Sequence, residues 1–125
     1  MGEVVNPDSL PDVFDDIAAQ LASRPERFVV IRTPLPLIAG RNPRKRTILW
    51  YFATSNNALV QVEGNRKEVW LPTYGHGEWE VMKAVDNYHV RVWRSLGFQV
   101  HRLEDFHPFA IQLGAAHCIK KYLNR

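Results

Sequence analysis

The residues with the clearest capacity for chemistry lie near the end of the chain, in the segment LGAAHCIKKYLNR. Cys118 is the only cysteine among 125 residues, and His117 directly precedes it. A cysteine thiolate is a strong nucleophile, and a nearby imidazole can activate it by taking the thiol proton. The competing interpretation is structural, because cysteine is among the most often buried residue types and packs as a small apolar side chain. The pair is therefore either catalytic or part of the core.

Strand geometry argues against a dyad of these two residues. If the segment is extended, neighbouring side chains point to opposite faces, so His117 faces away from the sulfur of Cys118. This favours Cys118 as the candidate nucleophile and His117 as a positioning or packing residue. An unperturbed thiol has a pKa near 8.5, so the thiolate needs a nearby cation, a helix N-terminus or a cationic substrate to be abundant at neutral pH.

Other polar side chains are candidates for acid/base or substrate-binding groups beside Cys118. Glu104, Asp105 and His107 shortly precede the cysteine, and TYGHGEWE places His76 and Glu78 in a glycine-flanked loop. Each is more typical of a solvated loop residue than of a site. The histidines show neither HExxH nor C-x-x-C spacing, so we predict no metal site.

Length and composition indicate one compact domain over residues 1–125. Hydrophobic residues make up 46% of the chain and charged residues 23%, as in folded proteins. The net charge is +3, and the cations gather in RNPRKR while four acids lie in DSLPDVFDDI. A basic loop of this size without an aromatic stacking platform argues against nucleic acid as a partner.

The expected compartment is the cytoplasm. A single cysteine cannot form an intramolecular disulfide, and the first residues, MGEVVNPDSL, have neither the cationic start nor the apolar run of a signal peptide. The apolar runs are shorter than the roughly 20 residues that a membrane-spanning helix needs, so no membrane role is predicted.

Periodicity in the first half of the chain predicts one helix and several strands. The helix lies in SLPDVFDDIAAQLASRP, begins after an N-cap at Ser9 and ends before Pro25. RFVVIRT is predicted to be a strand and IAGRNPRKRT a loop. Three apolar runs follow, at residues 48–52, 58–62 and 69–71. The pair Gly64-Asn65 predicts a tight turn that joins the last two runs in a hairpin.

The second half of the chain predicts a helix that runs directly into a strand. In GEWEVMKAVDNYHVRVWRSLGFQVHRL, apolar residues recur on one helical face, and Gly97 stands where a left-handed C-cap belongs. FQVHRL then alternates as a strand does. From Ala58 the order is strand, strand, helix, strand, so the predicted class is α/β with one complete ββαβ unit and partial flanking units. One such unit is an incomplete set for a closed repeat architecture.

These features together resemble a known family. SNNALVQVEGNRKEVWLPTYG and VRVWRSLGFQVHRLEDFHPFAIQLGAAHCIKKYLNR are similar to the C-terminal part of protein-arginine deiminases, members of the guanidino-group-modifying pentein superfamily. The supporting pieces are an N-x-x-V strand at residues 57–60, the LGF at 96–98, the EDFHPF, and the motif Gly114-Ala115-Ala116-His117-Cys118 with Arg125 beyond it. The resemblance is strongest over residues 48–125.

The resemblance implies a partial pentein-type α/β-propeller and hydrolysis of peptidyl-arginine to citrulline and ammonia. Cys118 would form the thiouronium intermediate, with Gly114 and His117 as the supporting motif. The substrate would be an arginine-containing protein or peptide. No cofactor is visible in the sequence, and calcium is implied by the family alone.

The chain departs from the family in two ways. Relatives often carry paired glycines before the cysteine, where this chain has Gly114-Ala115-Ala116. The chain also contains no His-x-Asp, and the guanidinium-binding carboxylates and the acid/base histidine of the family lie in upstream blades that we expect it to lack. Its substrate-binding residues are thus unknown, and activity in isolation depends on whether other residues supply these groups.

The alternative is a protein of another class. A truncated, non-catalytic relative or a small α/β interaction domain would fit the same pattern. Such a domain would form a homo-oligomer that covers the sheet edges left open by missing N-terminal blades.

Overall fold

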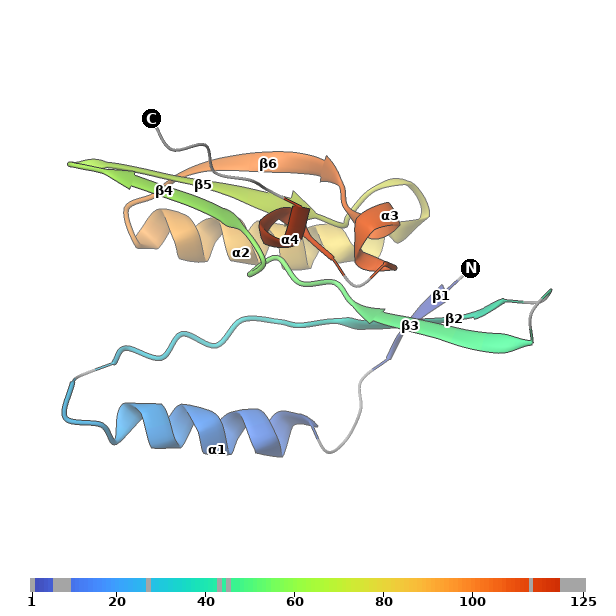
Figure 1. Ribbon diagram of the computed structural model, residues 1–125, viewed down its shortest axis with the longest axis horizontal. Helices are drawn as coiled ribbons and strands as arrows, with labels where there is room; N and C mark the ends of the chain where they lie inside the picture. The colour runs from blue at the N-terminus through green and yellow to red at the C-terminus, as the bar shows by residue number, and fades with distance from the viewer. Residues whose placement is uncertain are drawn as a thin grey trace.

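The computed structural model describes residues 2–5, 10–26, 28–42, 44, 46–112 and 114–119. Over these residues the protein is a mixed α/β structure with two three-stranded sheets and a few helices (Figure 1). The first sheet comes from the first half of the chain, and the second sheet, with the longest of the C-terminal helices, comes from the rest. The predicted α/β class is therefore confirmed.

The first sheet is antiparallel, with the order β1-β2-β3. Its strands are β1 (Gly2–Val5), β2 (Leu37–Asn42) and β3 (Thr47–Phe52). The prediction of β3 is confirmed. The prediction of a loop over residues 38–47 is wrong over residues 38–42, because residues 37–42 pair with β3 along their whole length, and holds for the turn at residues 44 and 46. Ile38 is buried in this hairpin, and the polar residues that follow Gly40 pair through their backbone, which composition does not reveal.

Helix α1 (Leu10–Ala22) ends before Pro25, as predicted, and the proposed cap Ser9 lies outside the described residues. The chain then runs back to β2 as an unpaired extended segment, so the prediction of a strand in RFVVIRT is wrong over residues 28–33 (Figure 1). Without a neighbouring strand, its β-branched side chains gain little burial, and Val29 is 86% exposed.

The second sheet contains the predicted ββαβ unit. Strand β4 (Leu59–Glu63) pairs antiparallel with β5 (Arg66–Thr73), and β5 pairs parallel with β6 (Gln99–Asp105). The crossover between the parallel strands is the 3₁₀ helix η1 (Gly77–Met82) followed by α2 (Lys83–Ser95). Gly64, with a φ of 56°, makes the tight hairpin turn between β4 and β5, as predicted.

The predicted glycine cap of α2 is confirmed. Gly97 has a φ of 84°, a left-handed conformation that suits glycine. The Gly97 amide donates to the carbonyl of Arg94 at 3.0 Å, and the Phe98 amide donates to the carbonyl of Trp93 at 3.1 Å. These are the two hydrogen bonds of a Schellman motif, and they turn the chain directly from α2 into β6.

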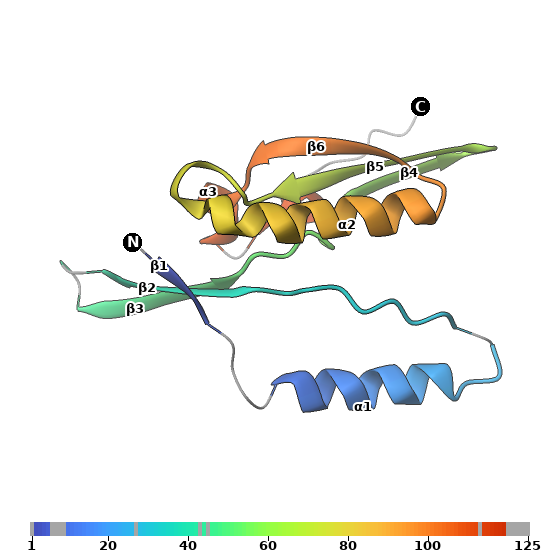
Figure 2. The ribbon, with the colours of Figure 1, turned by 180° about the vertical axis from the view of Figure 1, so that it is seen from behind.

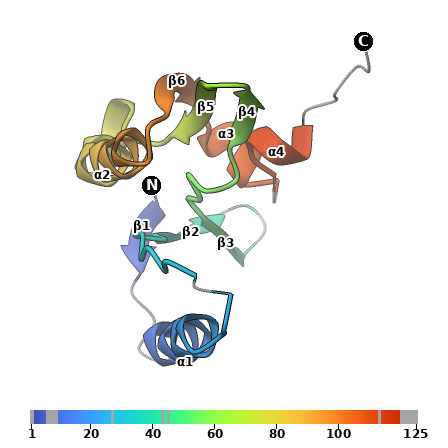
Figure 3. The same ribbon diagram turned by 90° about the vertical axis from the view of Figure 1, so that its left-hand side faces the viewer.

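Helices lie on both faces of the second sheet. Helix α2 covers one face, and the short helices α3 (His107–Ala110) and α4 (Ala116–Ile119) lie on the other (Figures 2 and 3). The core under α2 is built from Ala58, Val69, Leu71 and Val90. The core between the two sheets and the short helices contains Ile38, Tyr51, Ala53, Tyr74, Met82, Phe106, Ala110, Ala115 and Ala116.

Among the described residues, no helix is both long and apolar enough to cross a membrane.

Candidate functional site

Cys118 lies in helix α4 and is exposed. The prediction of an extended segment is therefore wrong, and so is the interpretation of Cys118 as a buried core residue. The physical reason lies in the two preceding alanines. Ala115 and Ala116 are buried in the core between the sheets, and the Cys118 amide donates to the Ala115 carbonyl at 3.0 Å, closing a helical turn. The buried alanines hold the turn against the protein and leave the thiol outside.

Asn57, just before β4, binds this turn through both ends of its side-chain amide. The His117 backbone amide donates to Asn57 Oδ1 at 2.8 Å and to the Asn57 carbonyl at 3.2 Å. Because Oδ1 accepts from the backbone, the other end of the amide, Nδ2, is the group that donates to Cys118 Sγ, at 3.2 Å. The same side chain thus positions the α4 turn and contacts its sulfur.

These contacts favour the thiolate. The backbone of Ala115 and the Nδ2 group of Asn57 both form hydrogen bonds with the sulfur, and they lower the pKa of the Cys118 thiol below its ordinary value. Partial desolvation opposes this shift but is the smallest of the three effects. An exposed thiol with a lowered pKa has the character of a reactive cysteine.

His117 and Gly114 support Cys118 in different ways from those that the motif suggested. The His117 side chain is exposed, and its imidazole makes no hydrogen bond to any residue that the structure describes. Its contribution comes from the backbone amide that binds Asn57. A Cβ at Gly114 would meet the Cys118 Cβ at 3.7 Å, an ordinary contact, so this chain does not need glycine there for space.

His107 is a core residue, contrary to the expectation of a solvated loop. Its side chain stacks on Trp79, with ring centroids 4.7 Å apart. Nε2 lies 2.8 Å from the Tyr74 carbonyl, and Nδ1 lies 2.6 Å from the Tyr51 hydroxyl. A carbonyl can only accept, so Nε2 carries the proton and, in the neutral ring, Nδ1 accepts from Tyr51. His107 therefore ties β3 of the first sheet to the end of β5 in the second.

Burial controls the ionisation of the tyrosines in this network. Desolvation, aided by the charge of Asp105, raises the pKa of Tyr51 to about 12. Desolvation and the charge of Asp86 likewise raise the pKa of the Tyr74 hydroxyl. Both hydroxyls stay protonated near neutral pH, so Tyr51 remains a hydrogen-bond donor to His107.

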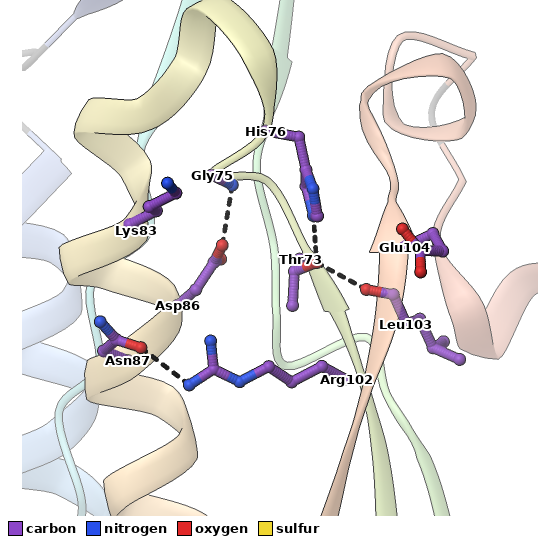
Figure 4. Close-up of a pocket in the computed structure, with 9 residues that line it drawn as sticks. All are labelled: Thr73, Gly75, His76, Lys83, Asp86, Asn87, Arg102, Leu103 and Glu104. Atoms are coloured by element: carbon purple, nitrogen blue, oxygen red, sulfur yellow. Dashed lines mark hydrogen bonds between the residues drawn. The ribbon is translucent and has the colours of Figure 1, made fainter.

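A pocket of about 240 Å³ opens at the carboxyl ends of β5 and β6, next to the first turns of α2 (Figure 4). We call it the strand-end pocket. It is lined by Thr73, Gly75, His76, Lys83, Asp86, Asn87, Arg102, Leu103 and Glu104. The Thr73 hydroxyl donates to the Leu103 carbonyl at 2.5 Å, so it accepts from His76 Nε2 at 2.6 Å. This fixes the proton of His76 on Nε2.

Asp86 holds the wall of the strand-end pocket. Asp86 is 4% exposed, and its carboxylate accepts from the backbone amide of Tyr74 at 3.0 Å. It also accepts from the Gly75 amide at 2.7 Å (Figure 4). The loop passes so close to α2 that a Cβ on Gly75 would lie 2.6 Å from the Lys83 backbone nitrogen. Asp86 and Gly75 therefore serve the structure of the loop.

The structure does not bring the remaining candidates to Cys118. His76 and Glu104 line the strand-end pocket on the α2 side of the sheet, whereas α4 lies on the opposite face (Figure 3). Asp105 accepts from the backbone amide of His107, and Glu78 is exposed in η1. In the described part of the chain, Cys118 has Asn57 as its side-chain partner, and no carboxylate or imidazole joins it.

Sequence reasoning missed the role of Asn57, which it used only as the start of a strand. Its contact with Cys118 spans 61 positions in the chain, and no local pattern marks such a pair. The signal that could have indicated this role is that Asn57 lies two positions before β4, because loop residues next to a rigid strand often bind or position other groups.

The described residues include no group of three or more His, Cys, Asp or Glu side chains placed to hold a metal ion. Comparison of the chain with protein-family models, curated proteins and solved structures found no match.

Replacing Asn57 with aspartate should make Cys118 less reactive. The aspartate keeps an oxygen for the His117 amide but replaces the donor at the sulfur with an anion, so the thiol pKa should rise and the thiolate fraction at neutral pH should fall. We expect alkylation by iodoacetamide at pH 7 to slow severalfold, and the pH midpoint of the alkylation rate to move upward.

The control is Asn56→Asp, which alters an exposed neighbour whose side chain is hydrogen-bonded to Thr33. An unchanged midpoint in Asn57→Asp would show that the hydrogen bond does not tune the thiol.

Proposed function

We propose that this chain is a protein-arginine-deiminase-like domain with Cys118 as its nucleophile, working in the cytoplasm. The observation that carries the proposal is the exposed thiol whose pKa is lowered by hydrogen bonds from the Ala115 backbone and Asn57. The ordered resemblance of residues 48–125 to the end of the deiminase catalytic domain adds the substrate class. On this proposal the ββαβ unit is one blade of a partial pentein-type α/β-propeller.

The chemistry assigned to Cys118 has two stages. The thiolate attacks the central carbon of a peptidyl-arginine guanidinium and forms a C–S bond; a C–N bond then breaks, and the nitrogen leaves as ammonia after it is protonated. Water next attacks the thiouronium carbon, and the C–S bond breaks to give peptidyl-citrulline and the free thiol. The positive charge of the substrate itself favours the thiolate.

The reaction also needs carboxylates to hold the guanidinium and an acid/base group to protonate the leaving nitrogen. In the described residues, neither lies against Cys118. The proposal therefore assigns these roles to residues outside the ββαβ unit, in further blades of the same fold. Among the described residues, no group of three or more His, Cys, Asp or Glu side chains could hold calcium. The proposed reaction has no step that uses it.

Citrulline formation on an arginine-rich protein tests the proposal. Wild-type protein should form peptidyl-citrulline and release ammonia in equal amounts when the complementary blades are present, and Cys118→Ser should form neither product. His117→Ala, which leaves the backbone amide that binds Asn57 in place, is the matched control and should retain activity. Citrulline formation that persists in Cys118→Ser would refute the assignment of the nucleophile.

A second candidate function is self-association through β3. This edge strand has no charge or proline, and Ile48 is 66% and Trp50 57% exposed. Edge strands without such protection favour pairing with another strand. A two-fold antiparallel pair centred on Trp50 would set Ile48 against Phe52 of the second copy and keep the two Arg46 side chains at opposite ends.

Mass in solution distinguishes the two candidates. An interaction domain should form a concentration-dependent dimer that Trp50→Glu abolishes. Val81→Glu changes an apolar residue in η1 that is 73% exposed, more than Trp50, and this variant should still dimerise. A wild-type protein that stays monomeric at all concentrations would exclude this candidate.

A further inference from the structure

We propose that the strand-end pocket binds a small zwitterion, namely a free α-amino acid, between Arg102 and Glu104. The pocket is lined in part by residues of α2. Cys118 belongs to α4, which lies on the opposite face of the second sheet from α2 (Figure 3), so this is a separate site from the proposed nucleophile. Its place at the carboxyl ends of parallel strands is where ligands commonly bind in α/β sheets.

Arg102 and Glu104 carry opposite charges, and both line the strand-end pocket. They flank Leu103 where the register between β5 and β6 shifts, because Leu71 pairs with Arg102 whereas Thr73 pairs with Asp105. No ion pair joins the two side chains. Arg102 instead extends across the pocket, where Nη2 donates to Asn87 Oδ1 at 2.7 Å (Figure 4). Asn87 thus holds the guanidinium at the α2 side of the pocket.

Both charged groups keep unused binding capacity. A guanidinium has five N–H donors, and Asn87 accepts from one of its nitrogens. The Glu104 carboxylate is exposed and makes no hydrogen bond or ion pair with the part of the chain that the structure describes. Guanidinium pairs well with a ligand carboxylate, and a carboxylate pairs with a ligand ammonium group.

Of the other two charged groups, Asp86 is buried against backbone amides and Lys83 is paired with an anion. Asp86 accepts from the amides of Tyr74 and Gly75, and Lys83 Nζ donates to Glu80 at 2.7 Å. The charges left open are therefore one cation and one anion, which favours a zwitterion over a simple carboxylate or a simple amine. His76, with its proton held on Nε2 by Thr73, is left with Nδ1 as an acceptor at the rim.

Titration by ¹H–¹⁵N NMR tests this site, with glycine, L-alanine and L-glutamine as probes. Saturable shifts are expected at the amides of Thr73, Gly75 and Asn87. Acetate and methylammonium each carry half of the zwitterion and should bind at least about tenfold more weakly. Binding as tight by acetate as by glycine would overturn the zwitterion assignment, and no saturable shift with any probe would overturn the site.

Matched variants locate the binding. Arg102→Gln and Glu104→Gln should each weaken glycine binding at least about tenfold, since each removes one charged contact. Arg94→Gln changes an exposed arginine of α2 outside the pocket and should leave binding unchanged. Cys118→Ala should also bind normally, so failure of the deiminase proposal would leave this test unaffected. Equal binding by wild type and Arg102→Gln would contradict the assignment.

Discussion

Replacing Asp86 with alanine is expected to lower the free energy of unfolding by about 3 kcal/mol or more. The carboxylate is buried and accepts the backbone amides of Tyr74 and Gly75, so its removal leaves two amide donors without partners where water has little access. The same bonds fix the loop after β5 against α2. Urea unfolding followed by circular dichroism measures the loss.

Two further variants make the result specific. Asp16→Ala removes an exposed carboxylate from the middle of α1 and should change stability by no more than about 0.5 kcal/mol. Asp86→Asn keeps one oxygen acceptor and should fall between wild type and Asp86→Ala. Equal stability of Asp86→Ala and Asp16→Ala would mean that the loop amides find other partners.

Replacing His107 with phenylalanine is expected to cost about 2–3 kcal/mol. Phenylalanine keeps the aromatic packing against Trp79 but leaves the Tyr51 hydroxyl and the Tyr74 carbonyl without their partner in a buried place. Thermal or urea unfolding measures the change. Because His107 links the two sheets, the first sheet should also lose protection from amide hydrogen exchange.

A double-mutant cycle isolates the Tyr51–His107 contact. Combining Tyr51→Phe with His107→Phe removes both partners, so the double variant should be more stable than the sum of the two single losses predicts. His117→Phe is the control, since that imidazole is exposed and should tolerate the change. Strict additivity of the two single variants would show that the hydrogen bond contributes nothing.

Local patterns predicted the second half of the fold well. The apolar runs of β4 and β5, the alternation in β6, the turn at Gly64 and the cap at Gly97 all depend on neighbours in the sequence, and these elements formed as expected. The same patterns failed in the first half. RFVVIRT has strand composition but no partner strand, and IAGRN lacks that composition but pairs with β3.

The sequence identified the reactive residue of the candidate site but not the residues around it. Cys118 was found because it is the single cysteine, but its exposure results from Ala115 and Ala116 entering a core that is built by distant segments. Contacts over long sequence separation, such as Asn57 with Cys118 and Tyr51 with His107, leave no local pattern. The interpretation of the final segment as a strand failed for the same reason, since tertiary packing decided its conformation.

On the proposed function, Cys118 is a nucleophile suited to guanidinium-like groups. The test compares the rate of Cys118 alkylation by 2-chloroacetamidine with that by chloroacetamide, a neutral reagent of the same shape. Each rate is divided by the rate of the same reagent with glutathione, and the normalised ratio is the amidine value divided by the chloroacetamide value. With the complementary blades present, Cys118 should prefer the amidine over the chloroacetamide more strongly than glutathione does, with the adduct on Cys118 and none in Cys118→Ala. A normalised ratio of one or below, or no adduct on Cys118, would contradict it.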